Sequence, residues 1–66
     1  MNINKLKGKM VERGLNVEKL AELLGSNRAT LYRKLNAAEK ITIGEAVKMK
    51  NALELTDDEA SDIFFN

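Results

Sequence analysis

Residues 17–36 read VEKLAELLGSNRATLYRKLN and contain two short helical patterns that meet across Gly25 and Ser26. Apolar residues recur at steps of three and four on both sides of this turn, with Leu20, Ala21 and Leu24 before it and Leu31 and Leu35 after it. That spacing places each group on one face of a helix. A helix, a short turn containing glycine and a second helix are typical of a helix-turn-helix motif. We therefore expect the rest of the chain to hold these two helices at a fixed angle.

The composition of the chain limits what it can do. Its 66 residues are interpreted as one domain, residues 1–66, small enough for dimerisation to help its stability. It has no cysteine and no histidine, which removes disulfides, thiolate metal sites and the commonest general base. No apolar run approaches the roughly 20 residues that span a bilayer, and no signal segment opens the chain. These features favour a cytoplasmic protein.

The net charge of +1 is unevenly distributed. Residues 1–40 hold nine basic and four acidic side chains (+5), and residues 41–66 hold two basic and six acidic ones (−4), which together give +1. A molecule divided in this way can turn a positive face toward phosphates and its acidic end away from them. The alternative is an unevenly charged surface that is merely solvated.

Three further helices are predicted around the central pair, which makes the fold all-α with five short helices. The first spans about residues 4–13 and ends at Gly14, with Ile3, Leu6 and Met10 on one apolar face. Two capping boxes, Thr42 with Glu45 and Thr56 with Glu59, predict the starts of the last two helices. The expected inward residues there are Ile43, Ala46, Val47, Met49 and Leu53, then Ala60, Ile63 and Phe64.

Catalysis has little support in this sequence. The clustered acids Asp57, Asp58 and Glu59 are explained by a capping role in an exposed first turn, whereas a catalytic pair needs burial to separate its two pKa values. There is also no glycine-rich phosphate loop. We therefore expect no enzyme activity, no cofactor, no metal site and no small-molecule ligand.

The outward face of the second central helix has the chemistry of a base-reading surface. In a helix-turn-helix this helix lies in the major groove with its N-terminal residues at base edges. Arg28 and Arg33 are five residues apart, about 140° around the helix, and flank a groove-facing surface. Arginine pairs bidentately with guanine, Asn27 can read adenine in the same way, and Ala29 offers a methyl to thymine. Tyr32 is expected to reach a phosphate or pack on a sugar, while the alternative is that both arginines are ordinary solvated residues.

Phosphate contacts are expected from the residues that frame this helix. Asn16 stands at the N-terminus of the preceding helix, where amide hydrogens can meet an oxyanion. Asn36, Lys40 and the amides of Thr42 to Gly44 form a second anchor on the other side. Such contacts set the register on the duplex and carry no sequence information. For Lys40, loop solubility is the alternative.

With these residues in place, the chain resembles the phage-repressor and Cro type of helix-turn-helix domain. The resemblance rests on LAELLGSNRATLYRKL (20–35), preceded by LKGKMVERGLNVEK (6–19) and followed by ITIGEAVKMKNALEL (41–55). It implies a compact five-helix, lambda-repressor-like fold and, as in most members, a dimeric repressor. It also implies base reading at Asn27, Arg28, Ala29, Tyr32 and Arg33 and phosphate binding at Asn16, Asn36 and Lys40.

Two positions depart from the family pattern. The first residue of helix two is often a polar phosphate binder, and here it is Val17, so the contact is expected to pass to Asn16 and Lys19. The residue after the turn glycine is often apolar, and here it is Ser26, which we interpret as the N-cap of the next helix.

The predicted function is that of a sequence-specific transcriptional repressor that binds a pseudo-palindromic operator in double-stranded DNA as a homodimer, with recognition helices about 34 Å apart. The dimer contacts are expected from Leu55, Ile63, Phe64 and Phe65. The alternative is a helix-turn-helix protein-interaction module without DNA contact, which would use the acidic segment 54–62. Arg28, Arg33 and the absence of acidic residues in 27–36 argue against that alternative.

Overall fold

The computed structural model describes residues 1–65, which form five α-helices and no strand. In chain order the elements are α1 (Ile3–Glu12), α2 (Val17–Leu24), α3 (Arg28–Asn36), the short 3-10 helix η1 (Ala38–Lys40), α4 (Ile43–Ala52) and α5 (Asp57–Phe64). The predicted all-α class and its five helices are confirmed. No described helix is long and apolar enough to cross a membrane.

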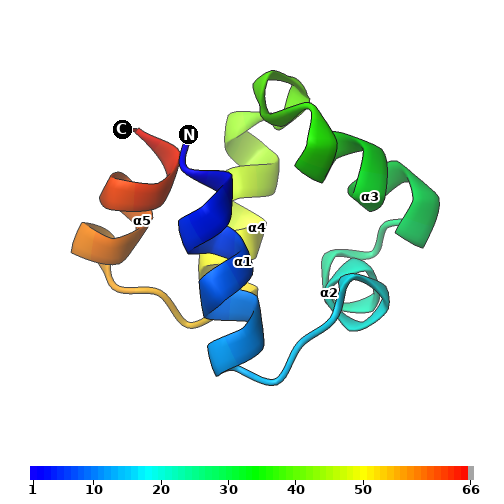
Figure 1. Cartoon of the computed structure of the whole chain (residues 1–66), viewed down its shortest axis with the longest axis horizontal. Coiled ribbons are helices and arrows are strands. Elements are labelled where there is room, and N and C mark those ends of the chain that lie inside the picture. Colours follow the sequence, from blue (N-terminus) through cyan, green and yellow to red (C-terminus); the bar gives the residue numbers. More distant parts are fainter. Residues whose placement is uncertain (66) are drawn as a thin grey trace.

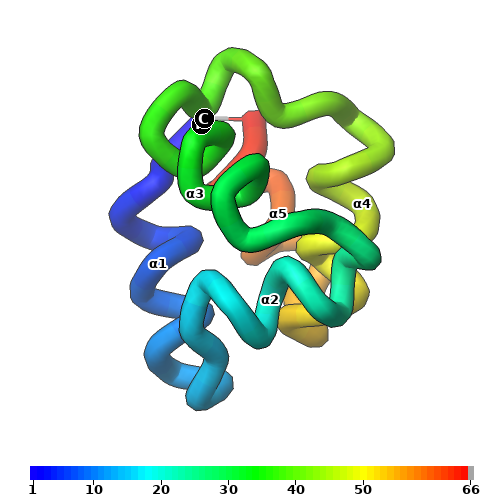
Figure 2. The backbone as a smooth tube through the Cα atoms, turned by 90° about the vertical axis from the view of Figure 1, so that its right-hand side faces the viewer, coloured from blue at the N-terminus to red at the C-terminus, as the bar shows by residue number. Residues whose placement is uncertain are grey.

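All five helices contribute to one hydrophobic core. Figure 1 shows α1 in front of α4 at the centre, with α5 on one side and α2 and α3 on the other. α2 packs against both α3 and α4, and α1 packs against α5. Figure 2, turned toward α3, shows this helix on the outside of the molecule with α2 beneath it. The buried core residues are Leu6, Met10, Leu20, Ala21, Leu31, Leu35, Met49, Leu53, Leu55, Ala60 and Ile63.

The ends of α2 follow the predicted capping chemistry. At its start, Asn16 Oδ1 accepts the N–H of Lys19 at 2.8 Å. At its end, Gly25 has a φ of +67°, and the amides of Gly25 and the next residue donate back to carbonyls of the last turn. This is a Schellman motif, in which a left-handed residue lets the chain leave the helix sharply. The two predicted capping boxes, Thr42–Glu45 and Thr56–Glu59, are also confirmed.

The predicted N-cap of α3 is wrong by one residue. Asn27 precedes the helix, and its Oδ1 accepts the N–H of Thr30 at 3.0 Å. Ser26 belongs instead to the turn, where its amide closes the end of α2. Because serine and asparagine cap equally well, local sequence does not decide between neighbouring candidates. Asn27 therefore has a structural role of its own, apart from any contact with a ligand.

The inward face of α4 also differs from the prediction. Met49 and Leu53 are fully buried, whereas Ile43 and Val47 are 76% and 52% exposed. Val47 stands two residues before Met49, about 200° around the helix, so the two side chains cannot share a face. Since Met49 lies in the core, Val47 points to solvent.

The residues expected to form the dimer contact are partly unavailable. Leu55 and Ile63 are buried in the chain's own core, so their assignment to a surface between two copies is wrong. Phe64 is half-buried against that core, and Phe65 is 73% exposed. The prediction failed because an apolar pattern does not distinguish a core residue from one that awaits a partner.

Candidate nucleic-acid interface

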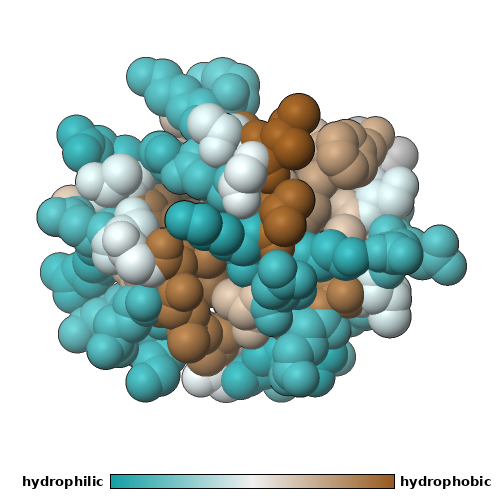
Figure 3. Space-filling model, turned by 180° about the vertical axis from the view of Figure 1, so that it is seen from behind, coloured by the Kyte–Doolittle hydropathy of each residue, from teal (hydrophilic) through white to brown (hydrophobic). Residues whose placement is uncertain are grey.

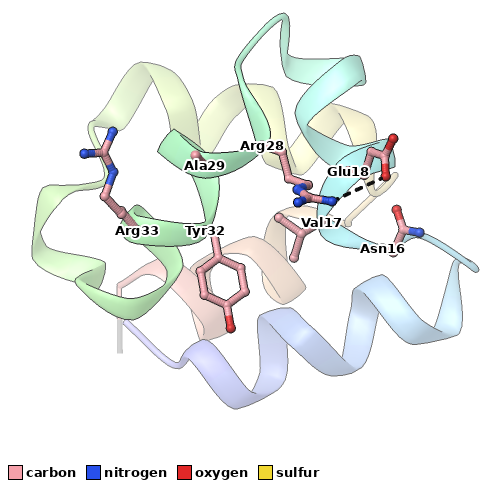
Figure 4. Close-up of a pocket in the computed structure, with 7 residues that line it drawn as sticks. All are labelled: Asn16, Val17, Glu18, Arg28, Ala29, Tyr32 and Arg33. Atoms are coloured by element: carbon pink, nitrogen blue, oxygen red, sulfur yellow. Dashed lines mark ion pairs between the residues drawn. The ribbon is translucent and has the colours of Figure 1, made fainter.

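An open groove of about 840 Å³ lies between the outer face of α3 and the N-terminal turn of α2. Figure 4 shows the side chains that surround it. Five of the predicted site residues line it, namely Asn16, Arg28, Ala29, Tyr32 and Arg33, together with two that were not predicted, Val17 and Glu18. The structure thus brings four of the five predicted base-reading residues together with one predicted phosphate-binding residue.

The packing of α3 explains why these side chains are exposed. Leu31 and Leu35 stand one turn apart and are both buried, which fixes the inward face of the helix. The residues on the other side must then face solvent, and Tyr32 retains 59% of its exposure. The hydrophobic anchors of α3 therefore decide which polar side chains are presented.

The two arginines stand at opposite ends of this surface, with Tyr32 between them (Figure 4). Arg28 Nη1 lies 3.8 Å from Glu18 Oε2, and this ion pair joins the two walls of the groove. Arg33 has no ion pair with any residue in the range 1–65. Both guanidiniums can donate several hydrogen bonds in a planar fork, the geometry that reads guanine or clamps a phosphate.

Apolar groups lie between the two arginines. Val17 is half-buried against the core, while Ala29 is exposed, and the ring of Tyr32 adds a flat apolar face. A thymine methyl group is read by this kind of contact. The groove therefore combines forked donors with a small apolar floor.

Asn27, the remaining predicted base-reading residue, does not line the groove. Its Oδ1 is bonded to the Thr30 amide, so one of the two groups needed for bidentate reading of adenine is already in use. If Asn27 contacts adenine, its Oδ1 would thus have to accept a hydrogen bond from the base as well as the one from Thr30 that caps α3.

The other predicted phosphate-binding residues lie near the two ends of the α2–α3 pair and outside the groove. Lys19 is on α2, where it pairs with Glu22 at 3.7 Å. Asn36 ends α3, Lys40 ends η1, and Thr42 caps α4, and all three are exposed. The Thr42 amide, predicted as a phosphate donor, already donates to Glu45 Oε1 at 2.9 Å. The Thr42 hydroxyl accepts the Glu45 amide at 3.1 Å and keeps its own proton as a donor.

Two of the three basic residues of α1 are paired with acids of α5. Lys5 forms an ion pair with Asp62, and Lys9 forms one with Glu59. The Lys9 ammonium, aided by the Thr56 amide, lowers the pKa of Glu59 to about 2, and Glu59 raises the pKa of Lys9. We name these four residues the α1–α5 seam. Part of the acidic end therefore pairs with the basic half, because α5 packs against α1.

A similar pairing occurs beside α3. Lys34 bonds to Glu45 of the α4 capping box, and this contact lowers the pKa of Glu45. The exposed cationic side chains that keep no ion pair within residues 1–65 are Lys7, Arg13, Arg33, Lys40 and Lys48, of which Arg13 donates to the backbone carbonyl of Glu54. Two of them, Arg33 and Lys40, lie on α3 and on the connector that follows it.

Sequence reasoning did not assign Val17 and Glu18 to the site. Val17 was noted only as a departure from a polar family position, and Glu18 was not among the predicted site residues. A signal was present, because the first turn of helix two must lie beside the start of helix three when only a short turn separates them.

Comparisons of the chain with protein-family models, with curated proteins and with solved structures find no match.

Proposed function

We propose that this chain is a sequence-specific transcriptional repressor of the phage-repressor and Cro type, with α2 and α3 as its helix-turn-helix. The observation that carries the proposal is the outer face of α3, where Arg28, Tyr32 and Arg33 line one exposed groove with the start of α2. No acidic residue interrupts positions 27–36. Such a surface matches the donors, acceptors and methyl groups at base edges in the major groove.

The shape of the α2–α3 pair supports this role. Figure 1 shows α2 nearly end-on and α3 along its length, so the two axes are far from parallel, as in helix-turn-helix motifs. The major groove is roughly 12 Å wide and admits an α-helix such as α3, whose diameter with side chains is about 10–12 Å. Arg28 begins α3, at the end expected to meet base edges.

The size of the molecule supports action as a dimer. Its longest dimension is 27 Å, which is less than the roughly 34 Å between successive major grooves on one face of DNA. One chain therefore cannot read two half-sites.

Figure 3 shows apolar side chains exposed together on the face opposite to that of Figure 1. On α4, Ile43 and Val47 stand one turn apart with their side chains mostly exposed. The proposal expects a second copy of the chain to cover this apolar face.

The alternative, a protein-interaction module that uses the acidic segment 54–62, is less well supported. Asp57, Glu59 and Asp62 are each paired with a lysine of the same chain. A partner that sought negative charge on this segment would have to compete with those lysines.

The test is duplex binding as a function of salt. Sequences are first recovered by the protein from a pool of random duplexes, and affinity is then measured between about 50 and 200 mM salt. A DNA reader is expected to show a log–log slope near −0.9 for each phosphate contacted. The recovered sequences are expected to contain two half-sites related by a dyad. Failure to bind any duplex at the lowest salt would contradict the proposal.

A further inference from the structure

The ion pair between Glu18 and Arg28 has no evident role in folding. Both side chains are highly exposed, at 69% and 70%, and the 3.8 Å separation is long for a charged hydrogen bond. An exposed pair of this kind contributes about 0–1 kcal/mol to stability. Glu18 also stabilises the positive end of α2, but that interaction does not require its carboxylate to face Arg28. The orientation of the Glu18 carboxylate toward Arg28 therefore points to a role in the groove and not in folding.

We infer that Glu18 is a positioning residue for base recognition, which holds the guanidinium of Arg28 in the orientation that reads guanine. This inference rests on the proposed DNA-binding function. The carboxylate faces Nη1 and leaves the rest of the guanidinium fork available for the two acceptors of guanine. The contact is weak while the groove is open to water, so its effect on Arg28 develops in the complex.

The pair strengthens when the duplex covers the groove. Removal of water lowers the effective dielectric constant, so the attraction between Glu18 and Arg28 increases in the complex. The same carboxylate faces the phosphates of the duplex and repels them. Glu18 is thus expected to lower affinity for DNA in general while it raises discrimination at one base pair.

These two effects have opposite signs, which makes the inference testable with Glu18→Gln. The matched control is Glu22→Gln, one turn further along α2. Its side chain is equally exposed, at 69%, and it pairs with Lys19 instead of with an arginine of the groove. Both substitutions remove one negative charge from the same helix. They differ in contact with Arg28.

The probes are a duplex recovered by the wild-type protein and its variants with each base pair replaced in turn. Arg28→Ala first identifies the base pair that Arg28 reads. At that position Glu18→Gln is expected to lower the preference for guanine by about three- to tenfold. The same variant is expected to bind unrelated duplexes about two- to threefold more tightly than wild type. Glu22→Gln is expected to raise binding to all duplexes alike and to keep the guanine preference.

An unchanged or increased guanine preference in Glu18→Gln would overturn the inference, because it would mean that Glu18 is neutral or masks Arg28. An equal loss in both variants would also overturn it, since the cause would then be charge alone. Neither outcome affects the proposed function, which fails if the wild-type protein binds no duplex or recovers no preferred sequence. Circular dichroism of the wild type and of Arg28→Ala, Glu18→Gln and Glu22→Gln checks that the helices are intact.

Discussion

The α1–α5 seam and the α2–α3 groove contain the same kinds of charged side chains but use them differently. In the seam, Lys5 and Lys9 each contact an acid of α5, and the pKa of Glu59 falls to about 2. In the groove, Arg28 has only a long, exposed contact with Glu18, and Arg33 forms no ion pair within residues 1–65. The position of a charge along the chain is thus a poor guide to its availability. A cation that is paired inside the fold stabilises it, and an unpaired one can bind a ligand.

The largest expected contrast between the two regions concerns DNA recognition. Arg28→Ala and Arg33→Ala should each relax the preference at one base pair, because each removes a bidentate contact worth about 1–3 kcal/mol of discrimination. Lys5→Ala removes one charge from the seam and should leave DNA affinity within about twofold of wild type. Fluorescence anisotropy with the recovered duplex and its single-base variants measures all three. Equal losses from all three substitutions would show that only net charge matters and would contradict the assigned roles.

A second contrast separates folding from reading at a single position, Asn27. Asn27→Ala should lower the free energy of unfolding by about 1 kcal/mol, because it removes the acceptor of the Thr30 amide. Asn27→Ser keeps a capping oxygen and should unfold close to wild type. Urea denaturation measures the difference. If Asn27 also reads a base, both variants should lose the same base preference, whereas recovery of that preference in Asn27→Ser would limit Asn27 to capping.

Local chemistry made the helices predictable. Contacts between residues three to five positions apart determine the span of α2, its Asn16 cap, Gly25 in the left-handed region and both capping boxes. The exposed face of α3 was predictable for the same reason, because Leu31 and Leu35 fix its inward side. The orientation of α3 accounts for the four predicted residues of this helix that line the groove, namely Arg28, Ala29, Tyr32 and Arg33.

Tertiary contacts account for what could not be predicted. Lys5 and Asp62 are 57 positions apart, and no local pattern brings them together. On α4, Met49 and Val47 are both apolar, and only the packing of neighbouring helices selects which one is buried. Glu54 adopts a positive φ of 53° at a helix end where sequence alone would favour glycine.

The seam should make stability depend on pH in the acidic range. The pKa of Glu59 is about 2 in the folded chain, against an ordinary value of 4.5, so the unfolded state binds more protons between these values. The stabilisation from Glu59 is therefore complete above about pH 4.5 and is lost as the pH falls toward 2. Urea denaturation from pH 6 to pH 2.5 measures this loss.

Two substitutions assign that loss to the seam. Glu59→Gln keeps a side chain that can complete the capping box with Thr56 but removes the titrating group, so its stability should fall less steeply with acid. Lys9→Gln removes the partner and should have a similar effect. If wild type and Glu59→Gln lose stability equally as the pH falls, the seam is not the source of the acid sensitivity.

The smallest expected effect is at Lys40, which lies at the end of η1 and has no ion pair within the described residues. If it contacts a phosphate, Lys40→Ala should weaken binding to every duplex by about two- to fivefold and reduce the salt slope by about one. Lys48→Ala is the matched control, since Lys48 is also exposed and unpaired among residues 1–65 but lies on α4, away from the groove. A uniform loss at Lys40 alone would place the duplex backbone beside the connector after α3. Equal losses of DNA affinity in both variants would instead show a long-range charge effect, and Lys40 would then serve only solubility.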